Sequence, residues 1–576
     1  MSADTIRHKP ELFVRKIDEK AQWIPHETVI RFPRGPDWET CGYRSLTWSQ
    51  YADSVNKTAH WLDKTLGRSV KNDTIAYAGP SDLRYAFIFA ALNKTSRKLL
   101  VPDGRFMQDG LGSLLKATDC KVWLHAEGEA FKTEAGLGEL GIETRQFPSL
   151  EWCLEAEGTT AYPYTKTYEE AKHDEIIIIH TSGTTGPPKP IVMNNGFWAA
   201  GASYATLARL NWPRGISTDS YFGRSLILAC PMRWLAGVIM TNSFAVFYRT
   251  VVILPPPDLI ALPPNVFEKI LKMNYEVDGL MGFPHTIVNL YKDSRTRESL
   301  KSLEFITYLG AALDREVGDA LCEHTRLGSV MGATESGGRF SLHPIDRKLW
   351  YTFQFIPEHH VRLERVKGSG VEAGGSDDDD VYHAFIDRPP GGGPSELQCG
   401  FWNFRMYGDV DSIDVKELWK PVKDLDGSTR WEFAGRADDY LKLIWACKFQ
   451  ARDMEVEVAR YPGVKHVMVG GSGRSAPFVL IEVDDKLLQK NPDELLDDIY
   501  GSSVAAVNEK TAPEARIPRE TVFLAKKEKP LRLTVKGLVS RRDAEKDYEQ
   551  EIKLAYDRLA NAQGSGAEAN FITYMK

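Results

Sequence analysis

Apolar residues recur along the chain with a period typical of helices, and short apolar runs separate these stretches. Between Tyr51 and Leu66 the apolar positions are spaced by four, four, three and four residues, which predicts an amphipathic helix ended by Gly67. The runs "DTIAYAGPS" and "VVIL" predict buried strands, and "RYAFIFAALNKTSRKLLVP" predicts a helix followed by a strand. Helix and strand alternate over roughly 300 residues, which predicts a layered α/β architecture with largely parallel sheets.

After Arg436 the predicted strands become shorter and alternate with helices. Short strands are predicted at "HVMVG", "PFVLIEV" and "TVFLA", and helices near 453–460, 493–508 and 541–560. This mixture predicts a smaller α+β domain of ordinary size. We therefore expect a large N-terminal α/β domain at 1–436 and a small, mobile C-terminal domain at 437–576.

Composition and charge narrow the class of protein. The 576 residues are 43% hydrophobic and carry a formal net charge of −7, so nothing indicates a nucleic-acid footprint. No run of 18 apolar residues predicts a membrane span, and the first residues have no apolar core typical of a secretory signal. The seven cysteines form no CxxC pair, which favours free thiols in a reducing compartment. We expect a cytoplasmic protein.

The stretch "IIIIHTSGTTGPPKP", from Ile176 to Pro190, joins an apolar strand to a loop rich in hydroxyls and glycines. Hydroxyl donors and unhindered backbone N–H groups are what a polyphosphate needs, and Lys189 adds a positive charge. The Walker pattern does not fit, because prolines flank Lys189. A solvent-exposed linker is the alternative, but linkers seldom follow core strands. The candidate phosphate-binding residues are Thr181, Ser182, Gly183, Thr184, Thr185, Gly186 and Lys189.

This loop resembles the signature loop of the adenylate-forming enzymes, which include acyl-CoA synthetases, aryl-acid ligases and adenylation domains of nonribosomal peptide synthetases. Further stretches resemble that family's motifs in the same order: "YLGAAL" (308–313), "MGATESGG" (331–338), "YGDV" (407–410), "FAGRADDYLKL" (433–443) and "PLRLTVKGLVSR" (530–541). The resemblance covers nearly the whole chain. It is strongest to fungal adenylation domains that stand alone or are linked to a reductase.

The resemblance implies that ATP and a carboxylic acid form an acyl-adenylate and pyrophosphate. Glu335 would bind Mg²⁺, which takes only one or two carboxylates, and Thr334 would contact the α-phosphate. Lys536 would be the catalytic lysine of the small domain, and Asp438 would lie in a hinge. The remaining nucleotide-binding positions implied by the motifs are Gly310, Ala311, Met331, Gly332, Asp409 and Arg436.

Several positions depart from the family pattern. Met331 stands where a tyrosine is usual, Tyr407 replaces threonine, and Lys536 precedes Gly537 instead of following a glycine. In "CPMRWLAGVIM" (230–240), Trp234 replaces a histidine, while Pro231 and Gly237 match. Trp234 is interpreted either as a wall of the acid pocket or as a core aromatic. By analogy, Gly237, Met331 and Gly337 would also face the pocket.

The same stretch indicates the class of acid. It contains no acidic residue that would pair an α-ammonium group, so an aryl or acyl carboxylic acid is the expected substrate. After residue 565 neither a carrier domain nor a dinucleotide-binding G-x-G-x-x-G is found. Free coenzyme A is therefore the expected acceptor. The alternatives are the phosphopantetheine of a separate carrier protein, an amine that yields an amide, or an excised domain of a longer protein, although the Met-Ser-Ala start favours an intact N-terminus. A degenerate nucleotide-binding scaffold is the non-enzymatic alternative.

Overall fold

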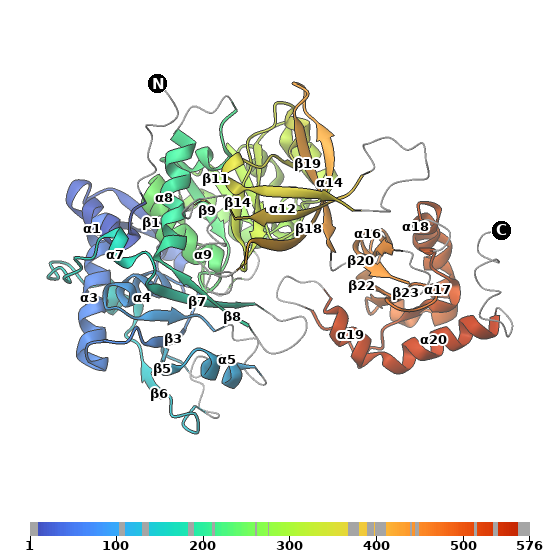
Figure 1. The fold of residues 1–576 in the computed structure, drawn as a ribbon, viewed down its shortest axis with the longest axis horizontal. Coiled ribbons are helices and arrows are strands. Elements are labelled where there is room, and N and C mark those ends of the chain that lie inside the picture. Colours follow the sequence, from blue (N-terminus) through green and yellow to red (C-terminus); the bar gives the residue numbers. More distant parts are fainter. Residues whose placement is uncertain are drawn as a thin grey trace. The chain divides into compact units, whose positions relative to one another are not determined.

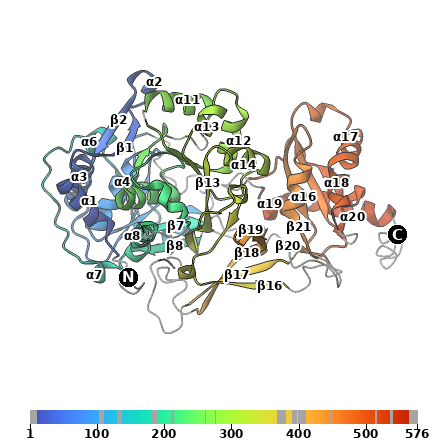
Figure 2. The same ribbon diagram turned by 90° about the horizontal axis from the view of Figure 1, so that it is seen from above.

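The computed structural model describes residues 10–102, 110–128, 137–181, 189–209, 214–257, 259, 262–274, 276–366, 380–388, 397, 410–437, 440–443, 448–511, 515–533 and 539–562. The chain divides into two compact units (Figures 1 and 2). The first runs to Phe433, apart from short segments such as Lys416–Trp419, and the second begins at Ala434. Of the helices in these ranges, none is long and apolar enough to cross a bilayer.

A six-stranded sheet with the order β6-β5-β3-β4-β7-β8 forms one layer of the first unit. All its pairs are parallel except β7–β8, which is antiparallel. β3 lies between β5 and β4, and all its residues except the last are buried, which explains its apolar sequence. Its strands are β3 (Thr74–Ala78), β4 (Lys98–Leu100), β5 (Cys120–His125), β6 (Glu143–Gln146), β7 (Glu175–Thr181) and β8 (Lys189–Asn194).

An eight-stranded sheet has the order β14-β13-β12-β11-β9-β10-β1-β2. Only its two outer pairs, β13–β14 and β1–β2, are antiparallel. The prediction of largely parallel sheets is thus confirmed for both large sheets. The strands are β1 (Thr28–Pro33), β2 (Tyr43–Thr47), β9 (Ser225–Ala229), β10 (Val251–Ile253), β11 (Gly279–Gly282), β12 (Phe305–Leu309), β13 (Arg326–Ala333) and β14 (Gly337–Phe340).

Helices cover these sheets, and the helix expected from Tyr51 to Leu66 is present as α3 (Trp48–Leu66). It begins at Trp48 because Thr47 and Gln50 form a capping box, and Gly67 follows it with φ 73°. It packs against α4 and α1 in the main hydrophobic core (Figure 1). The other helices of this unit are α1 (Phe13–Trp23), α2 (Trp38–Cys41), α4 (Arg84–Lys94), α5 (Leu111–Ala117), α6 (Leu150–Leu154), α7 (Tyr168–Ala171), α8 (Asn195–Arg209), α9 (Leu235–Ile239), the π-helix η5 (Met240–Phe244), α10 (Ala245–Tyr248), α11 (Pro264–Met273), α12 (Pro284–Lys292), α13 (Arg297–Lys301) and α14 (Arg315–Cys322).

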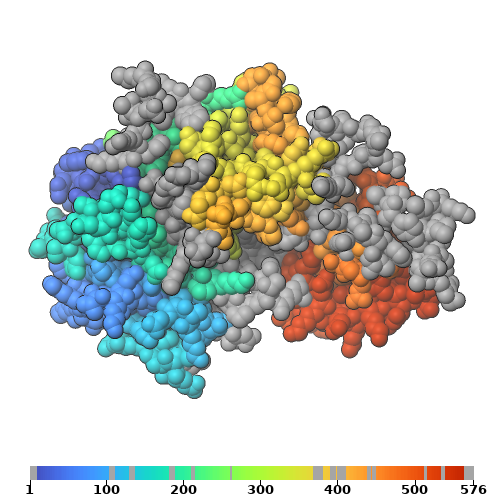
Figure 3. Space-filling model, in the orientation of Figure 1, coloured from blue at the N-terminus to red at the C-terminus, as the bar shows by residue number. Residues whose placement is uncertain are grey.

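A third sheet of the first unit, with the order β15-β19-β18-β17-β16, was not expected from the alternating pattern. Its pairs β15–β19 and β16–β17 are antiparallel. The turn between β18 and β19 is only a few residues long, too short for the crossover that parallel neighbours need. This yellow-to-orange part of the chain reaches the surface of the unit (Figure 3). The strands are β15 (Thr352–Phe353), β16 (Val361–Arg365), β17 (Tyr382–Asp387), β18 (Ser412–Lys423) and β19 (Thr429–Arg436).

The second unit contains the three strands predicted from its sequence, in the order β22-β23-β24, and a separate hairpin of β20 and β21. Two hydrophobic clusters pack on this sheet, one under α16 to α18 and one under α19 and α20. Its strands are β20 (Tyr440–Lys442), β21 (Lys448–Gln450), β22 (Val464–Gly470), β23 (Phe478–Val483) and β24 (Val522–Leu524). Its helices are α16 (Ala451–Val458), α17 (Pro492–Ile499), the π-helix η13 (Tyr500–Val504), α18 (Ala505–Glu509), α19 (Arg541–Asp547) and α20 (Glu549–Ala562).

The helix expected at 541–560 is interrupted. Tyr548 leaves the helical conformation between α19 and α20, with φ −106° and ψ 21°. Its buried hydroxyl accepts a hydrogen bond from the backbone N–H of Lys526 at 3.0 Å and donates one to the carbonyl of Lys529. The break therefore places the hydroxyl of Tyr548 where it can bond to backbone groups of the loop after β24, which would otherwise lack this partner.

The five cysteines within the described ranges are all free thiols, as the sequence predicted. Four of them are buried. Burial raises the pKa of the Cys120 thiol to about 11, because the thiolate would lose its hydration. Such a thiol is unreactive at neutral pH.

Candidate active site

The carboxyl ends of three parallel strands of the eight-stranded sheet form one row. Gly282 at the end of β11 pairs with Ala229 of β9 on one side and with Tyr308 of β12 on the other. The segments that follow these strands carry predicted site residues, and they leave the sheet side by side. Ligands of open α/β sheets bind outside the carboxyl ends of the strands, so this edge is the candidate active site.

Trp234 lies at this edge, directly before α9. Its indole is half-buried and meets the ring of Phe283 edge-on, with the centroids 5.1 Å apart and the planes at 70°. Phe283 follows β11, and its ring stacks in turn near that of His285. The two aromatic side chains form one apolar surface, and both belong to stretches that the sequence offered as pocket walls, "CPMRWLAGVIM" (230–240) and "GFPHTIV" (282–288).

Gly237 is required by close packing of α9 on the segment before it. A Cβ at this position would lie 2.3 Å from the carbonyl oxygen of Pro231 and 2.7 Å from the Cα of Met232. The turn is closed by the N–H of Trp234, which donates to the same carbonyl of Pro231 at 3.0 Å. Gly237 thereby sets the position of Trp234.

Gly310 and Ala311 follow β12 and are exposed. Gly310 has φ 87°, a conformation that favours glycine, and a Cβ there would lie 3.5 Å from the ring of Phe283. The bare backbone beside an aromatic ring leaves a flat surface of the kind on which a purine can lie. The adenine-binding role that the family motif implies for Gly310 and Ala311 stays a prediction.

The predicted Thr334 and Glu335 occupy the tip of the β13–β14 hairpin. Gly332 pairs with Gly338 and has φ 147°, and a Cβ on it would lie 2.1 Å from the carbonyl oxygen of Gly337. The turn is closed by the N–H of Ser336, which donates to the carbonyl of Ala333 at 3.1 Å. Met331 and Gly337 lie on the two strands of the same hairpin.

Glu335 is half-buried at this tip, and its carboxylate is a hard oxygen ligand. Within the described ranges no group of three or more metal-ligating side chains occurs. Mg²⁺ in nucleotide sites needs only one or two protein carboxylates, with phosphates and waters as its other ligands. The donor set at the tip therefore fits Mg²⁺ held together with a nucleotide.

A buried histidine behind β14 was missed by sequence reasoning. His359 is 1% exposed, and its Nε2 lies 2.8 Å from the hydroxyl of Tyr204 on α8. Its Nδ1 is buried and has no hydrogen-bond partner among the described groups. Burial, together with the charges of Arg339 and His360, lowers the pKa of His359 to about 3. The ring is thus neutral at physiological pH, and nothing in "PEHH" indicated this contact.

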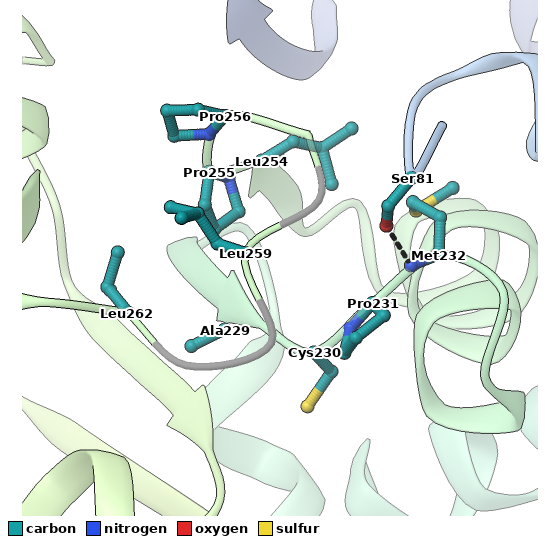
Figure 4. A pocket seen from close by; sticks show the side chains of 10 residues that line it. All are labelled: Ser81, Ala229, Cys230, Pro231, Met232, Leu254, Pro255, Pro256, Leu259 and Leu262. Atoms are coloured by element: carbon teal, nitrogen blue, oxygen red, sulfur yellow. Dashed lines mark hydrogen bonds between the residues drawn. The ribbon is translucent and has the colours of Figure 1, made fainter. Parts of the chain in front are cut away.

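A small pocket adjoins the same edge (Figure 4). Ser81 lies in the loop after β3 of the six-stranded sheet and accepts a hydrogen bond from the backbone N–H of Met232 at 2.7 Å. Met232 follows β9 of the eight-stranded sheet, so this bond joins a loop of one large sheet to a loop of the other. Among the described residues that line the pocket, none has a charged side chain. The pocket is lined by Ser81, Ala229, Cys230, Pro231, Met232, Leu254, Pro255, Pro256, Leu259 and Leu262.

The predicted phosphate loop is placed only by its ends. Thr181, the last residue of β7, pairs with Lys189, the first residue of β8, and Lys189 is exposed. The β7–β8 hairpin thus brings both ends of the loop together. Ser182, Gly183, Thr184, Thr185 and Gly186 lie outside the described residues, as do Asp409, Asp438 and Lys536.

Arg436 is the last residue of β19 and is half-buried. The residue before it, Gly435, has φ 109°, and a Cβ there would lie 1.8 Å from the side-chain amide nitrogen (Nε2) of Gln450. That amide donates to the carbonyl of Ala434 at 3.0 Å. The backbone at the start of the second unit is therefore held closely, immediately before the predicted hinge.

Comparison with known proteins places these observations in a family. Residues 21–358 match the model of the AMP-binding enzyme family, and residues 438–560 match the AMP-binding enzyme C-terminal domain. The chain is 27% identical to a carboxylic acid reductase of Neurospora crassa over 94% of its length and 50% of that protein. It is 26% identical to the isocyanide synthase–NRPS hybrid crmA of Aspergillus fumigatus over 89% of its length and 31% of that protein.

The chain thus spans half or less of these two relatives' length. Among solved structures, ATP-bound MatB from Rhodopseudomonas palustris superposes with a TM-score of 0.65 at 16% identity, covering 94% of this chain and 99% of that one. At that identity the likeness shows the fold, which is a large N-terminal α/β domain and a small C-terminal domain. Since the family model matches more than half of the chain, the protein belongs to the AMP-binding enzyme family and is an adenylate-forming enzyme.

Proposed function

We propose that this enzyme uses ATP to activate an aryl or acyl carboxylic acid as the acyl-adenylate and then transfers the acyl group to a thiol. The observation that carries the proposal is the presence of two kinds of surface along one sheet edge. The Thr334–Glu335 hairpin supplies polar groups, and the Trp234–Phe283 wall supplies an apolar surface. Such an edge suits a nucleotide at one end and an uncharged organic group at the other.

In this proposal each group of the chain has a distinct task. Thr334 donates a hydrogen bond to the α-phosphate, and Glu335 holds Mg²⁺, which offsets the charge of the phosphates. Gly310 and Ala311 leave room for the adenine, and Asp409 accepts hydrogen bonds from the ribose hydroxyls. The loop from Thr181 to Lys189 binds the β- and γ-phosphates. Lys536 brings a positive charge to the reacting carboxylate and α-phosphate.

We also propose that the N-terminal domain ends at Arg436 along the chain and that the hinge between the domains includes Asp438. Adenylation and thiol transfer need different groups at the same site, and a rotation within a few residues can supply them in turn. The close contact of Gly435 with Gln450 supports a defined starting point for such a rotation.

For the acceptor, two candidates remain in the proposal. Free coenzyme A suits the acid–thiol ligase chemistry of the motifs. The phosphopantetheine arm of a carrier protein is favoured by the curated relatives, which include a carboxylic acid reductase and a peptide-synthetase hybrid that extend beyond the matched region. An amine acceptor that yields an amide is the third outcome that the experiment below distinguishes.

The test is pyrophosphate release by the purified protein with ATP, Mg²⁺ and a panel of acids that includes benzoate, cinnamate, hexanoate and decanoate. We expect at least one aryl or acyl acid to stimulate release, and glycine and alanine to have no effect. Coenzyme A is then added, and the acyl thioester is measured by mass spectrometry. Nucleotide binding without pyrophosphate release for any acid would favour a non-catalytic scaffold. Release without a thioester would favour a carrier or an amine as acceptor.

A further inference from the structure

The segment with Lys536 is closed at its base by a short stem of described residues. Leu533 and Val539 form an antiparallel bridge, and the N–H of Ser540 donates to the carbonyl of Arg532 at 2.8 Å. Only residues 534–538 lie between the two sides of this bridge. Whatever holds the stem therefore holds the two ends of the segment, Leu533 and Val539.

The side of the stem that enters the segment is held by two contacts. The N–H of Leu531 donates to the carboxylate of Glu482 on β23 at 2.9 Å. The guanidinium of Arg532 pairs with the carboxylate of Asp547 on α19, with Nε 2.9 Å from Oδ2. Arg532 is largely exposed, so this ion pair is screened by solvent and contributes little to positioning.

The side that leaves the segment is held by a more enclosed pair, Glu455 and Arg541. Glu455 on α16 is 6% exposed, and its Oε1 lies 2.6 Å from Nη1 of Arg541, the first residue of α19. The same carboxylate oxygen accepts the N–H of Val469 on β22 at 3.0 Å. Arg541 Nη1 also donates to the carbonyl of Val469. Three elements therefore meet at one charged pair, two residues beyond the Leu533–Val539 bridge.

We propose that Glu455 and Arg541 are positioning residues for the adenylation step, because their pair holds the stem of the Lys536 segment in register with the β22–β23 sheet. The inference rests on the proposed function, in which Lys536 assists the attack of the carboxylate on ATP. A lysine side chain is long and flexible, and its charge acts only when its backbone is held in place. The pair, in which Glu455 is buried and Arg541 is partly exposed, would act by holding the backbone at the end of this segment.

The test compares Glu455→Gln and Arg541→Lys with the wild type, using the acid of the panel that gives the fastest pyrophosphate release. Glutamine keeps an acceptor for the N–H of Val469 but removes the charge, and lysine keeps the charge but loses the planar fork. We expect kcat for pyrophosphate release to fall by about 10- to 100-fold in both variants, as small misplacements of a reacting group do. The KM for ATP is expected to change by less than about threefold.

A double-mutant cycle with Lys536→Ala separates positioning from a general loss of structure. If Glu455 acts through Lys536, Glu455→Gln should reduce the residual activity of Lys536→Ala by less than about twofold. The matched control is Asp497→Asn. Asp497 lies on α17, away from the stem, and its Oδ1 is 2.7 Å from Nε of Arg519 in the same domain. This control should leave kcat unchanged.

Three results would overturn the proposal. The first is an unchanged kcat in both variants. The second is that Glu455→Gln lowers kcat by the same factor in the Lys536→Ala background as in the wild type. The third is that both variants lose activity together with a lower melting temperature. If the wild type itself releases no pyrophosphate with any acid of the panel, the proposed function fails, and this inference fails with it. If the wild type is active and both variants are unaffected, only the positioning role of Glu455 and Arg541 is wrong.

Discussion

The carboxyl edge of the eight-stranded sheet and the stem of the Lys536 segment position their groups by opposite means. At the sheet edge, backbone lies directly against backbone, and Gly332 and Gly237 leave no room for even a methyl group. At the stem, charged side chains from α16 and α19 do the holding, through Glu455 and Arg541. The comparison teaches that the first region should be sensitive to added volume and the second to lost charge.

The largest effect is expected from removal of Lys536, the proposed catalytic lysine. Lys536→Ala should reduce pyrophosphate release by about 10²–10³, because one preorganised charge at the reacting groups is lost. Thioester formation from a synthetic acyl-adenylate should remain nearly intact, since the proposed second step does not use this lysine. Lys510→Ala is the control, because Lys510 is an exposed lysine of the same domain paired with Glu457. Equal losses in both half-reactions would indicate misfolding or a hinge defect instead.

At the sheet edge, the corresponding change is to the apolar wall. Trp234→Ala should alter the ratio of kcat/KM between a large and a small acid by about 10- to 200-fold, because a contact of this size in a hydrophobic site is lost. Bulkier acids should gain relative to the preferred one. The same variant is examined by urea denaturation. An unchanged ratio together with a lower free energy of unfolding would assign Trp234 to the core.

Added volume should damage the hairpin that carries Thr334 and Glu335. Gly332→Ala places a Cβ 2.1 Å from the carbonyl oxygen of Gly337 and should lower the free energy of unfolding by about 1–3 kcal/mol. Gly338→Ala is the matched control on the opposite strand, because its Cβ would lie 3.4 Å from a side-chain carbon of Val330. The two free energies are measured by urea denaturation. Equal effects would show that the hairpin can relax around the added methyl group.

Acid should weaken the first unit, which contains the sheet edge, through His359. Its folded-state pKa of about 3 lies below the ordinary value of 6.5, so the unfolded chain binds this proton first as the pH falls. Stability is therefore full above about pH 6.5 and is lost as the pH falls toward 3, by about 1.4 kcal/mol per pH unit. His359→Gln should remove about 2 kcal/mol of the difference between the unfolding free energies at pH 7 and pH 5. If wild type and variant show the same pH dependence, another group is responsible.

Local patterns determined much of this protein from its sequence. The helix predicted from Tyr51 to Leu66, several buried strands of the two large sheets, such as β3, β4 and β10, and the three strands of the second unit follow from neighbouring residues and their period. Thr334 and Glu335 were identified differently, because their stretch "MGATESGG" (331–338) resembles a family motif. The structure then showed these two residues at the hairpin tip.

Only the tertiary structure decided which distant residues meet. His359 contacts Tyr204 across 155 positions, Ser81 contacts Met232 across 151, and Glu455 contacts Arg541 across 86. The row of Ala229, Gly282 and Tyr308 likewise depends on strand order, and the break at Tyr548 depends on backbone groups of an earlier loop. Periodicity reports which face of an element is buried, but not which side chain it will face, because that depends on how separate elements pack.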